Sequence, residues 1–398
     1  MSMRLLRFCL FAFMAAFASA VNAEEVVDSV DPGTSDVPQI SLITCGPGKD
    51  IYELEGHTAL RIRHNGMDVA VNYGLFDFDA PNFVYRFVKG ETDYMVGAAP
   101  FEYFLRQYVR EGRDVYEQPL NLSPDAARRL VELLDENLRR ENRVYRYNYV
   151  KDNCATRPLA MIERAMGDTL ALMAGGYTEG WTFREAMRYY HRNYPWYQFG
   201  IDLALGSGID YVITEREKAF VPVVLMEMMA GCGVVDSTFV LSAGDKAMPE
   251  PTPWWLTPLA VGIAVLLFAI GIAVRDVRRM KVTRWVDACL FGIYGIAGLV
   301  IAFLVFVSEH EATSPNWLLL WLNPFCLIVP AFIYIKSCRK LVKLYGIVNF
   351  VALFLLIILW PLTGQSGNVA FIPLILADAT LTIRYLYITR CLKLTNRI

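Results

Sequence analysis

Hydrophobic residues are distributed unevenly along this chain of 398 residues. Charged side chains are frequent up to about residue 250 and sparse after it. Five apolar segments follow, each close to the ~20 residues that a helix needs to cross a bilayer. They cover residues 254–274, 286–307, 317–335, 342–361 and 369–390. The pattern predicts an all-α transmembrane domain with five helices over residues 251–398.

The charges of the connecting loops predict how these helices are oriented. Lys and Arg are concentrated in loops 275–284 and 336–343 and in the C-terminal tail, whereas loops 308–316 and 363–368 have none. Basic loops stay on the cytoplasmic side of a bilayer. We therefore expect the tail in the cytoplasm and the N-terminal domain on the opposite side.

The first 23 residues have the pattern of a secretory signal peptide. Arg4 and Arg7 precede a short apolar run, and a small-residue cleavage site ends at Ala23. An uncleaved membrane anchor is the competing interpretation. Cleavage would leave an exported domain over residues 24–250, which agrees with the loop charges.

The exported domain begins with a strand pattern and a hairpin pattern. Residues 39–45 read as a strand, and residues 57–64 alternate between two faces. Asn65-Gly66 is a strong signal for a two-residue turn, and residues 68–74 return as the partner strand.

The turn sets the register of this hairpin. If His64 pairs with Met67, then His57 lies opposite Gly74, and Asn72 lies diagonally opposite His57 on the same face of the sheet. A slip of one residue would move Asn72 to the other face. The hairpin therefore predicts that the side chains of His57 and Asn72 meet.

Two helices are predicted further along the exported domain. The first starts at Ser123-Pro124-Asp125, a cap followed by proline and an acidic first turn, and continues to about residue 142. The second runs from about Cys154 to Met166, before a glycine. Strands and helices together predict an α+β fold.

Three cysteines fall within the exported domain, Cys45, Cys154 and Cys232. An odd number in an oxidising compartment leaves at least one thiol free. Cys45 and Cys232 could form a disulfide and leave Cys154 free, or all three could be reduced.

Cys154 lies where an extended segment becomes a helix, a place where backbone N–H groups favour a thiolate and lower its pKa. Pro158 suggests that the regular helix starts nearer Thr156. His57 is the candidate base for this thiol, and Asn72 would hold the imidazole in one tautomer. Structural packing is the simpler interpretation of either residue alone, but their combined context favours catalysis.

Other features limit the classes of function. A net charge of −2 gives no indication of nucleic-acid binding. Four scattered histidines lack the spacing of metal ligands, so neither a metal nor another cofactor is expected. Asp378 in the fifth apolar segment should have a structural partner, and Arg384 should extend toward the cytoplasm. The aromatic and basic stretch 183–199 fits either the lipid interface or packing within the domain.

Several motifs carry a family resemblance: Gly56-His57-Thr58-Ala59-Leu60-Arg61-Ile62, Val71-Asn72-Tyr73-Gly74, Asp152-Asn153-Cys154 and Ser308-Glu309-His310. The first and third resemble the circularly permuted branch of the papain-like, NlpC-type thiol enzymes, in which the histidine precedes the cysteine. Over nearly its full length the chain is similar to the Lnb family of lipoprotein N-acyltransferases. That family joins a periplasmic thiol domain to a multi-span membrane domain.

The resemblance implies a permuted papain-like (NlpC-type) periplasmic domain held at the bacterial inner (cytoplasmic) membrane. Cys154 would take an acyl chain from a phospholipid and pass it, as a thioester, to the N-terminal amine of a diacylglyceryl lipoprotein. His57 and Asn72 would complete the catalytic group. Asn153 and Tyr73 would contribute to substrate binding. His310 would position a headgroup or the acceptor amine, and a solvated loop histidine is the alternative interpretation.

Two other functions remain open. A membrane-anchored NlpC-type peptidoglycan peptidase would use the same thiol with water as the acceptor, although one span would suffice as its tether. A non-catalytic membrane scaffold would carry an inactive thiol domain.

Overall fold

The computed structural model describes residues 36–76, 81–244 and 251–394. The expected signal peptide, residues 1–23, lies outside the described residues. The expected domain boundary near residue 250 falls within 245–250, which also lies outside them. The described residues belong to one compact unit.

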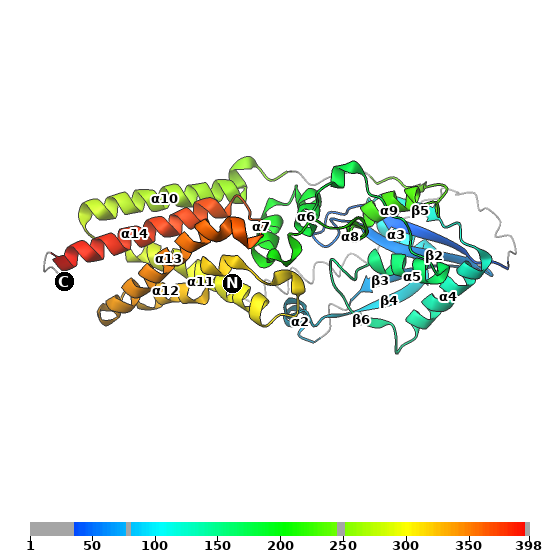
Figure 1. Ribbon diagram of the computed structural model, residues 1–398, viewed down its shortest axis with the longest axis horizontal. Coiled ribbons are helices and arrows are strands. Elements are labelled where there is room, and N and C mark those ends of the chain that lie inside the picture. Colours follow the sequence, from blue (N-terminus) through cyan, green and yellow to red (C-terminus); the bar gives the residue numbers. More distant parts are fainter. Residues whose placement is uncertain (1–35, 77–80, 245–250, 395–398) are drawn as a thin grey trace. The chain divides into compact units, whose positions relative to one another are not determined.

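The N-terminal part is built on a seven-stranded antiparallel sheet in the order β6-β4-β3-β2-β1-β5-β7 (Figure 1). The strands are β1 (Gln39–Cys45), β2 (His57–His64), β3 (Met67–Leu75), β4 (Asp93–Pro100), β5 (Val115–Pro119), β6 (Val144–Arg146) and β7 (Phe239–Ser242).

The hairpin of β2 and β3 has the predicted register. His64 pairs with Met67, and Ala59 pairs with Asn72. Asn65 (φ 49°) and Gly66 (φ 75°) both have positive φ, as the two central residues of a type I′ turn require. The prediction that Asn72 shares a face with His57 is therefore confirmed.

Helices cover both faces of the sheet. The helices of the N-terminal part are α2 (Phe83–Lys89), α3 (Phe101–Arg110), α4 (Pro124–Leu138), α5 (Thr156–Met166), α6 (Phe183–His191), α7 (Pro195–Ala204), α8 (Glu215–Lys218) and α9 (Pro222–Gly231). Helix α4 starts as predicted, because the Ser123 hydroxyl accepts a hydrogen bond from the Ala126 N–H at 3.2 Å. The combination of an antiparallel sheet with helices confirms the α+β prediction for this part.

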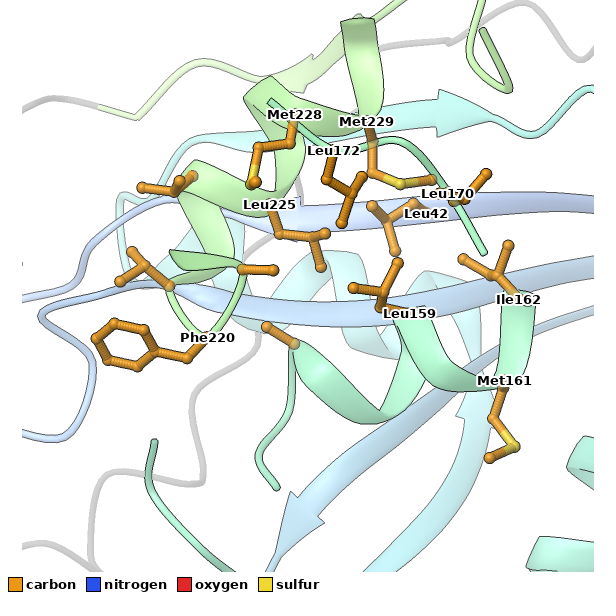
Figure 2. Close-up of a cluster of buried hydrophobic side chains, with 14 of the residues drawn as sticks. Leu42, Leu159, Met161, Ile162, Leu170, Leu172, Phe220, Leu225, Met228 and Met229 are labelled. Carbon is orange, nitrogen blue, oxygen red and sulfur yellow. The ribbon is translucent and has the colours of Figure 1, made fainter. Parts of the chain in front are cut away.

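The larger core lies between one sheet face and helices α4, α5 and α9. Figure 2 shows Leu42 of β1 among side chains of α5 and α9, including Leu159, Ile162 and Leu225. Fully burying one such side chain stabilises a fold by about 1.5–3 kcal/mol. The opposite face packs against α3 through a smaller cluster that contains Ile43, Cys45, Ala59, Ala70, Phe101, Phe104, Tyr108 and Val115.

Four helices in the described part of the chain are long and apolar enough to cross a membrane. They are α10 (Pro258–Arg279), α11 (Arg284–Phe306), α13 (Arg339–Thr363) and α14 (Phe371–Leu394), drawn from yellow-green to red in Figure 1. The predicted third helix, 317–335, is wrong as a continuous element. This segment forms the short pieces η5 (Trp317–Leu320), η6 (Pro324–Leu327) and α12 (Ile328–Phe332).

The broken segment nevertheless runs antiparallel to α11. A Cβ atom added to Gly298 would lie 2.4 Å from the carbonyl carbon of Asn323, and one added to Gly295 would lie 2.6 Å from Cγ of Leu327. Small residues allow such close approach between membrane segments. Pro324 at the start of η6 interrupts regular hydrogen bonding along the segment, so the segment runs beside α11 without forming one continuous helix.

Polar side chains within the membrane segments are paired. Asp378 accepts a hydrogen bond from Nδ2 of Asn349 at 2.6 Å, so it has the structural partner that the sequence predicted. Arg384 is buried between Asp276 and Asp287 instead of extending to the surface. The expectation for Arg384 was wrong because two carboxylates on other helices neutralise it internally.

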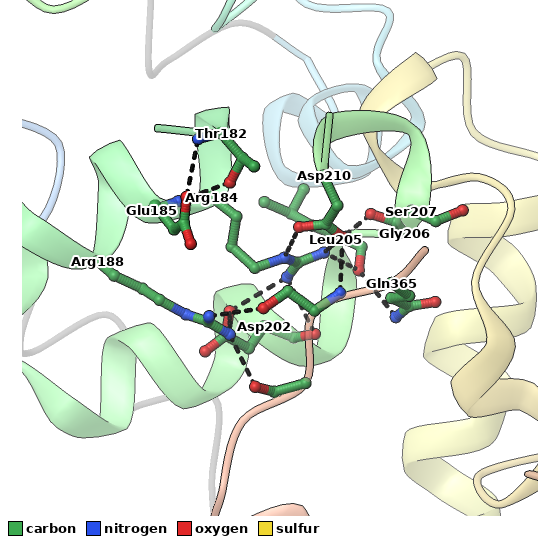
Figure 3. A network of polar contacts seen from close by, with 12 residues as sticks. Thr182, Arg184, Glu185, Arg188, Asp202, Leu205, Gly206, Ser207, Asp210 and Gln365 are labelled. Atoms are coloured by element: carbon green, nitrogen blue, oxygen red, sulfur yellow. Dashed lines mark hydrogen bonds and ion pairs between the residues drawn. The ribbon is translucent and has the colours of Figure 1, made fainter. Parts of the chain in front are cut away.

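A buried ion network joins α6 and α7 to the loop that follows α13. Arg184 is fully buried and donates to Asp210 at 2.7 Å and to Asp202 at 3.1 Å (Figure 3). Arg188 also contacts Asp202, and it donates to the Ser366 hydroxyl at 2.8 Å. The stretch 183–199 therefore packs, in part, against a loop that has no Lys or Arg. This agrees with the orientation predicted from the loop charges.

Candidate active site

A glycine with positive φ precedes His57, the first residue of β2. Gly56 has φ +89°, and a Cβ atom there would lie 2.6 Å from the carbonyl oxygen of Cys45, so only glycine fits. Nε2 of His57 lies 2.9 Å from Oδ1 of Asn72, and the imidazole stacks on Tyr108. Because an amide oxygen only accepts, Nε2 carries the proton and Nδ1 of His57 keeps its lone pair. The predicted meeting of His57 and Asn72 is confirmed.

Cys154 lies beside the end of the central strands β2 and β3 at which His57 is found. A Cβ atom on Gly74 would lie 3.7 Å from Cβ of Cys154, and Gly74 has φ +91°. The Thr58 N–H and the Tyr147 hydroxyl both donate toward the Cys154 sulfur. Thr58 follows His57 in β2, so the structure brings the thiol to the strand end that carries the histidine.

Asn153 organises the turn before α5. Its Oδ1 accepts hydrogen bonds from the N–H groups of Ala155 at 2.9 Å and Thr156 at 3.0 Å. Its Nδ2 donates to the carbonyl oxygens of Tyr149 and Phe220. The Asn153 amide is buried and its hydrogen bonds hold this turn, and a substrate-binding role for Asn153 stays a prediction.

Burial dominates the protonation of the thiol. The regular helix begins at Thr156, as the position of Pro158 suggested. Burial raises the pKa of Cys154 to about 11, although the Thr58 N–H and the Tyr147 hydroxyl act to lower it. The expected thiolate is therefore not the resting form. Asn153 occupies the first amides of α5, so these amides do not stabilise an anion on the sulfur.

Burial also keeps the imidazole neutral. It lowers the pKa of His57 to about 4, against the hydrogen bond to Asn72, which raises it. Arg113 lowers the pKa further by charge repulsion. At neutral pH the site holds a thiol and a neutral imidazole, so the sulfur can attack only if it loses its proton to a base.

Two further groups beside the thiol were not found from the sequence. Tyr147 covers Cys154, and its ring would lie 3.4 Å from a Cβ atom on Gly74. Buried Glu55 accepts a hydrogen bond from Nε2 of His191 at 2.7 Å, and its charge acts to raise the pKa of Cys154. Glu55 and His191 are 136 residues apart. The position of Glu55, two residues before His57, was the available signal.

Two other expected substrate-binding residues lie away from the thiol. Tyr73 is fully buried on the opposite face of the sheet from Asn72, since neighbouring residues of a strand point to opposite faces. Nε2 of His310 lies 2.9 Å from the carbonyl oxygen of Phe87 in α2. The structure gives Tyr73 a core position and His310 a contact between an outer loop and α2. The substrate-binding roles expected for Tyr73 and His310 stay predictions.

Cys45 and Cys232 do not form a disulfide. Cys45 packs under α3 with the smaller cluster, whereas Cys232 ends α9 and packs against the larger core on the other face. The sheet separates the two thiols. In the described ranges, no group of three or more His, Cys, Asp or Glu residues is arranged to hold a metal ion.

Comparisons with known proteins identify both parts of the chain. Residues 31–188 match the model of the Lnb N-terminal periplasmic domain, and residues 250–395 match the model of the Lnb transmembrane domain. No curated protein and no solved structure matches the chain. Because both domains of one family follow each other and together cover most of its length, the chain belongs to the Lnb family.

Proposed function

We propose that Cys154 is the nucleophile of an acyltransferase that moves an acyl chain from a phospholipid to the N-terminal amine of a diacylglyceryl lipoprotein. Membership of the Lnb family supports the proposal. One observation carries it. The Cys154 thiol receives the Thr58 N–H at the strand end where Asn72 holds His57. The thiol domain would act in the periplasm, at the outer face of the bacterial inner membrane.

In the first half-reaction, the Cys154 sulfur attacks the ester carbonyl carbon of the phospholipid. Because the resting thiol is protonated, Nδ1 of His57 accepts its proton as the C–S bond forms. The tetrahedral intermediate then breaks the ester C–O bond, and the imidazolium returns the proton to the departing glycerol oxygen. The products are a thioester on Cys154 and a lysophospholipid.

In the second half-reaction, the lipoprotein amine attacks the thioester carbon. An α-amine has a pKa of about 8 and must be neutral to attack. His57 accepts the proton that the amine loses as the C–N bond forms. The C–S bond breaks, and the sulfur takes the proton from the imidazolium, which restores the thiol and releases the N-acylated lipoprotein.

Both half-reactions place negative charge on a carbonyl oxygen, which needs hydrogen-bond donors. The N–H groups of Ala155 and Thr156 are occupied by Asn153. We propose that the N–H groups of Cys154 and Thr58, which hydrogen-bond to the thiol, donate to this carbonyl oxygen.

The proposal is tested by trapping the intermediate. Purified protein in phosphatidylethanolamine vesicles should gain the mass of one acyl chain on Cys154, and hydroxylamine should remove it. Cells that carry Cys154→Ala should lose N-acylation of lipoprotein N-termini, measured by mass spectrometry.

Cys232→Ala is the matched control, because Cys232 is a free, half-buried cysteine whose thiol donates to the Met229 carbonyl oxygen. This variant should keep full N-acylation. Normal N-acylation in Cys154→Ala would contradict the proposal. Release of muropeptides without an acyl-enzyme would instead favour a peptidase, and full function of Cys154→Ser would favour a scaffold.

A further inference from the structure

A buried carboxyl group lies close to the reacting sulfur and takes no part in the proposed transfer. This group belongs to Glu55, which comes two residues before His57 and three before Thr58. The Thr58 N–H is hydrogen-bonded to the Cys154 sulfur, and the charge of Glu55 acts on the same sulfur. The thiol is therefore within the electrostatic reach of Glu55.

Two other segments of the chain hold the Glu55 side chain in place. Its Oε1 accepts a hydrogen bond at 2.7 Å from Nε2 of His191, the last residue of α6. The Tyr149 hydroxyl also donates to Glu55. The carbonyl oxygen of Tyr149 in turn accepts a hydrogen bond at 2.9 Å from Nδ2 of Asn153, the residue before the thiol. Glu55 is thus fixed between strand β2 and the segment that leads to Cys154.

These contacts need a hydrogen-bond acceptor at position 55, but they do not need a charge. The amide oxygen of a glutamine could accept from His191 and Tyr149 in the same way. Burying a carboxylate is costly, and the charge of Glu55 opposes loss of the Cys154 proton, which the first half-reaction requires. Neither the hydrogen bonds nor the donor step accounts for the negative charge.

The second half-reaction brings a positive charge to the same place. An α-amine has a pKa of about 8, so at neutral pH the acceptor is mainly an ammonium ion. The phospholipid donor instead carries a negatively charged phosphate group. A carboxylate in surroundings of low dielectric constant attracts a cation and repels an anion strongly, without direct contact. The charge of Glu55 therefore favours the acceptor over a second donor molecule once the thiol is acylated.

We propose that Glu55 selects the acceptor of the second half-reaction, because its carboxylate attracts the α-ammonium group of the lipoprotein to the thioester on Cys154. This inference rests on the proposed function. The attracted ammonium group first releases one proton to water. The neutral amine then attacks the thioester carbon as the C–N bond forms and the C–S bond breaks. His57 takes the second amine proton and passes it to the departing sulfur.

Removing the charge while keeping the shape of the side chain tests this role. Glu55→Gln retains an acceptor for His191 and Tyr149. Cys154 is first acylated from phosphatidylethanolamine vesicles, and the acyl-enzyme is then mixed with a diacylglyceryl-cysteinyl peptide. In Glu55→Gln the rate constant of transfer at low peptide concentration should fall about threefold or more. Acylation should be at least as fast as in the native protein, because the charge that raises the pKa of Cys154 is gone.

Glu227→Gln is the matched control, because Glu227 of α9 also accepts a hydrogen bond from a tyrosine hydroxyl, that of Tyr177 at 2.7 Å. It should keep the native rate constants of both half-reactions. Hydroxylamine is uncharged at neutral pH and should release the acyl group equally fast from the native protein and from Glu55→Gln. Thermal unfolding shows whether each variant is folded. Equal losses in both half-reactions of folded Glu55→Gln, or unchanged transfer to the peptide, would overturn the proposal.

A binding measurement separates this inference from the proposed chemistry. Cys154→Ala in vesicles is titrated with a fluorescent diacylglyceryl-cysteinyl peptide and with the same peptide lacking its α-amine group. The peptide with the amine should bind about threefold or more tightly, and adding Glu55→Gln should abolish this preference. No preference, or one that survives Glu55→Gln, would refute selection by Glu55 even if Cys154 is acylated in the native protein. A preference that depends on Glu55, in a protein that never forms an acyl-enzyme, would refute only the proposed function.

Discussion

The hydrogen bond between His57 and Asn72 can be tested by removing its acceptor. Asn72→Ala deletes the oxygen that lies 2.9 Å from Nε2 of His57. In the resting state the bond joins neutral groups and is worth about 0.5–1.5 kcal/mol, whereas in the transition state it supports an imidazolium and is worth about 1.5–3 kcal/mol. Only the difference, about 1–1.5 kcal/mol, affects the rate.

A difference of this size lowers the acylation rate constant about tenfold. In the native protein this hydrogen bond raises the pKa of His57. Its loss in Asn72→Ala should lower that pKa, so the acid limb of the rate profile should move to lower pH. Asn72→Asp keeps an acceptor and adds a negative charge. It should retain most of the rate and move the acid limb to higher pH.

The assay is single-turnover acylation of Cys154 from phosphatidylethanolamine vesicles, measured from well below the His57 pKa of about 4 up to alkaline pH. Asn137→Ala is the matched control, since Asn137 donates to the Leu133 carbonyl oxygen within α4 at 2.8 Å. A rate for Asn72→Ala within twofold of the native rate, with an unmoved acid limb, would refute the assigned role of this hydrogen bond.

Three further changes test the protonation of the site, the glycine beside the thiol and the buried Arg184 network. The rate of alkylation of Cys154 by iodoacetamide should keep rising as the pH approaches the Cys154 pKa of about 11, without a plateau near neutral pH. The rate of acylation should fall as the pH drops through the His57 pKa of about 4. A plateau in the alkylation rate near pH 7 would contradict the assigned protonation states. Gly74→Ala forces a side chain into φ +91° beside the thiol and should cost about 1–2 kcal/mol of unfolding free energy together with activity. Gly200→Ala, inside helix α7 and with nothing within 4 Å of the added atom, should not lower the unfolding free energy in the same thermal unfolding assay. Arg184→Leu leaves buried carboxylates without their cation and should cost about 3–5 kcal/mol; an unchanged denaturation midpoint would show that the network is dispensable.

Local patterns were sufficient for much of the architecture. The alternation of β2 and β3 and the turn Asn65-Gly66 gave the register that brings Asn72 to His57. Apolar segment lengths gave four of the five predicted helices. The third failed because hydropathy measures how apolar a segment is, and the contacts with α11 that favour an irregular path are not local in sequence.

The protonation of the site depended on the tertiary structure. A helix start next to Cys154 predicted a lowered pKa, but burial of the sulfur raises it more than the hydrogen bonds from Thr58 and Tyr147 lower it. Desolvation depends on every group that surrounds an atom, including groups far along the chain. The hydrogen bond between Glu55 and His191 likewise joins residues that are far apart along the chain.

The sequence by itself determined four of the long apolar helices, how the hairpin is registered and which side of the membrane carries the thiol, because periodicity and loop charge act over a few neighbouring residues. Only the tertiary structure decided that thiol and imidazole are both neutral and that the Asn153 amide holds the turn before α5. Those properties arise from burial and from contacts between distant segments, which no local pattern encodes.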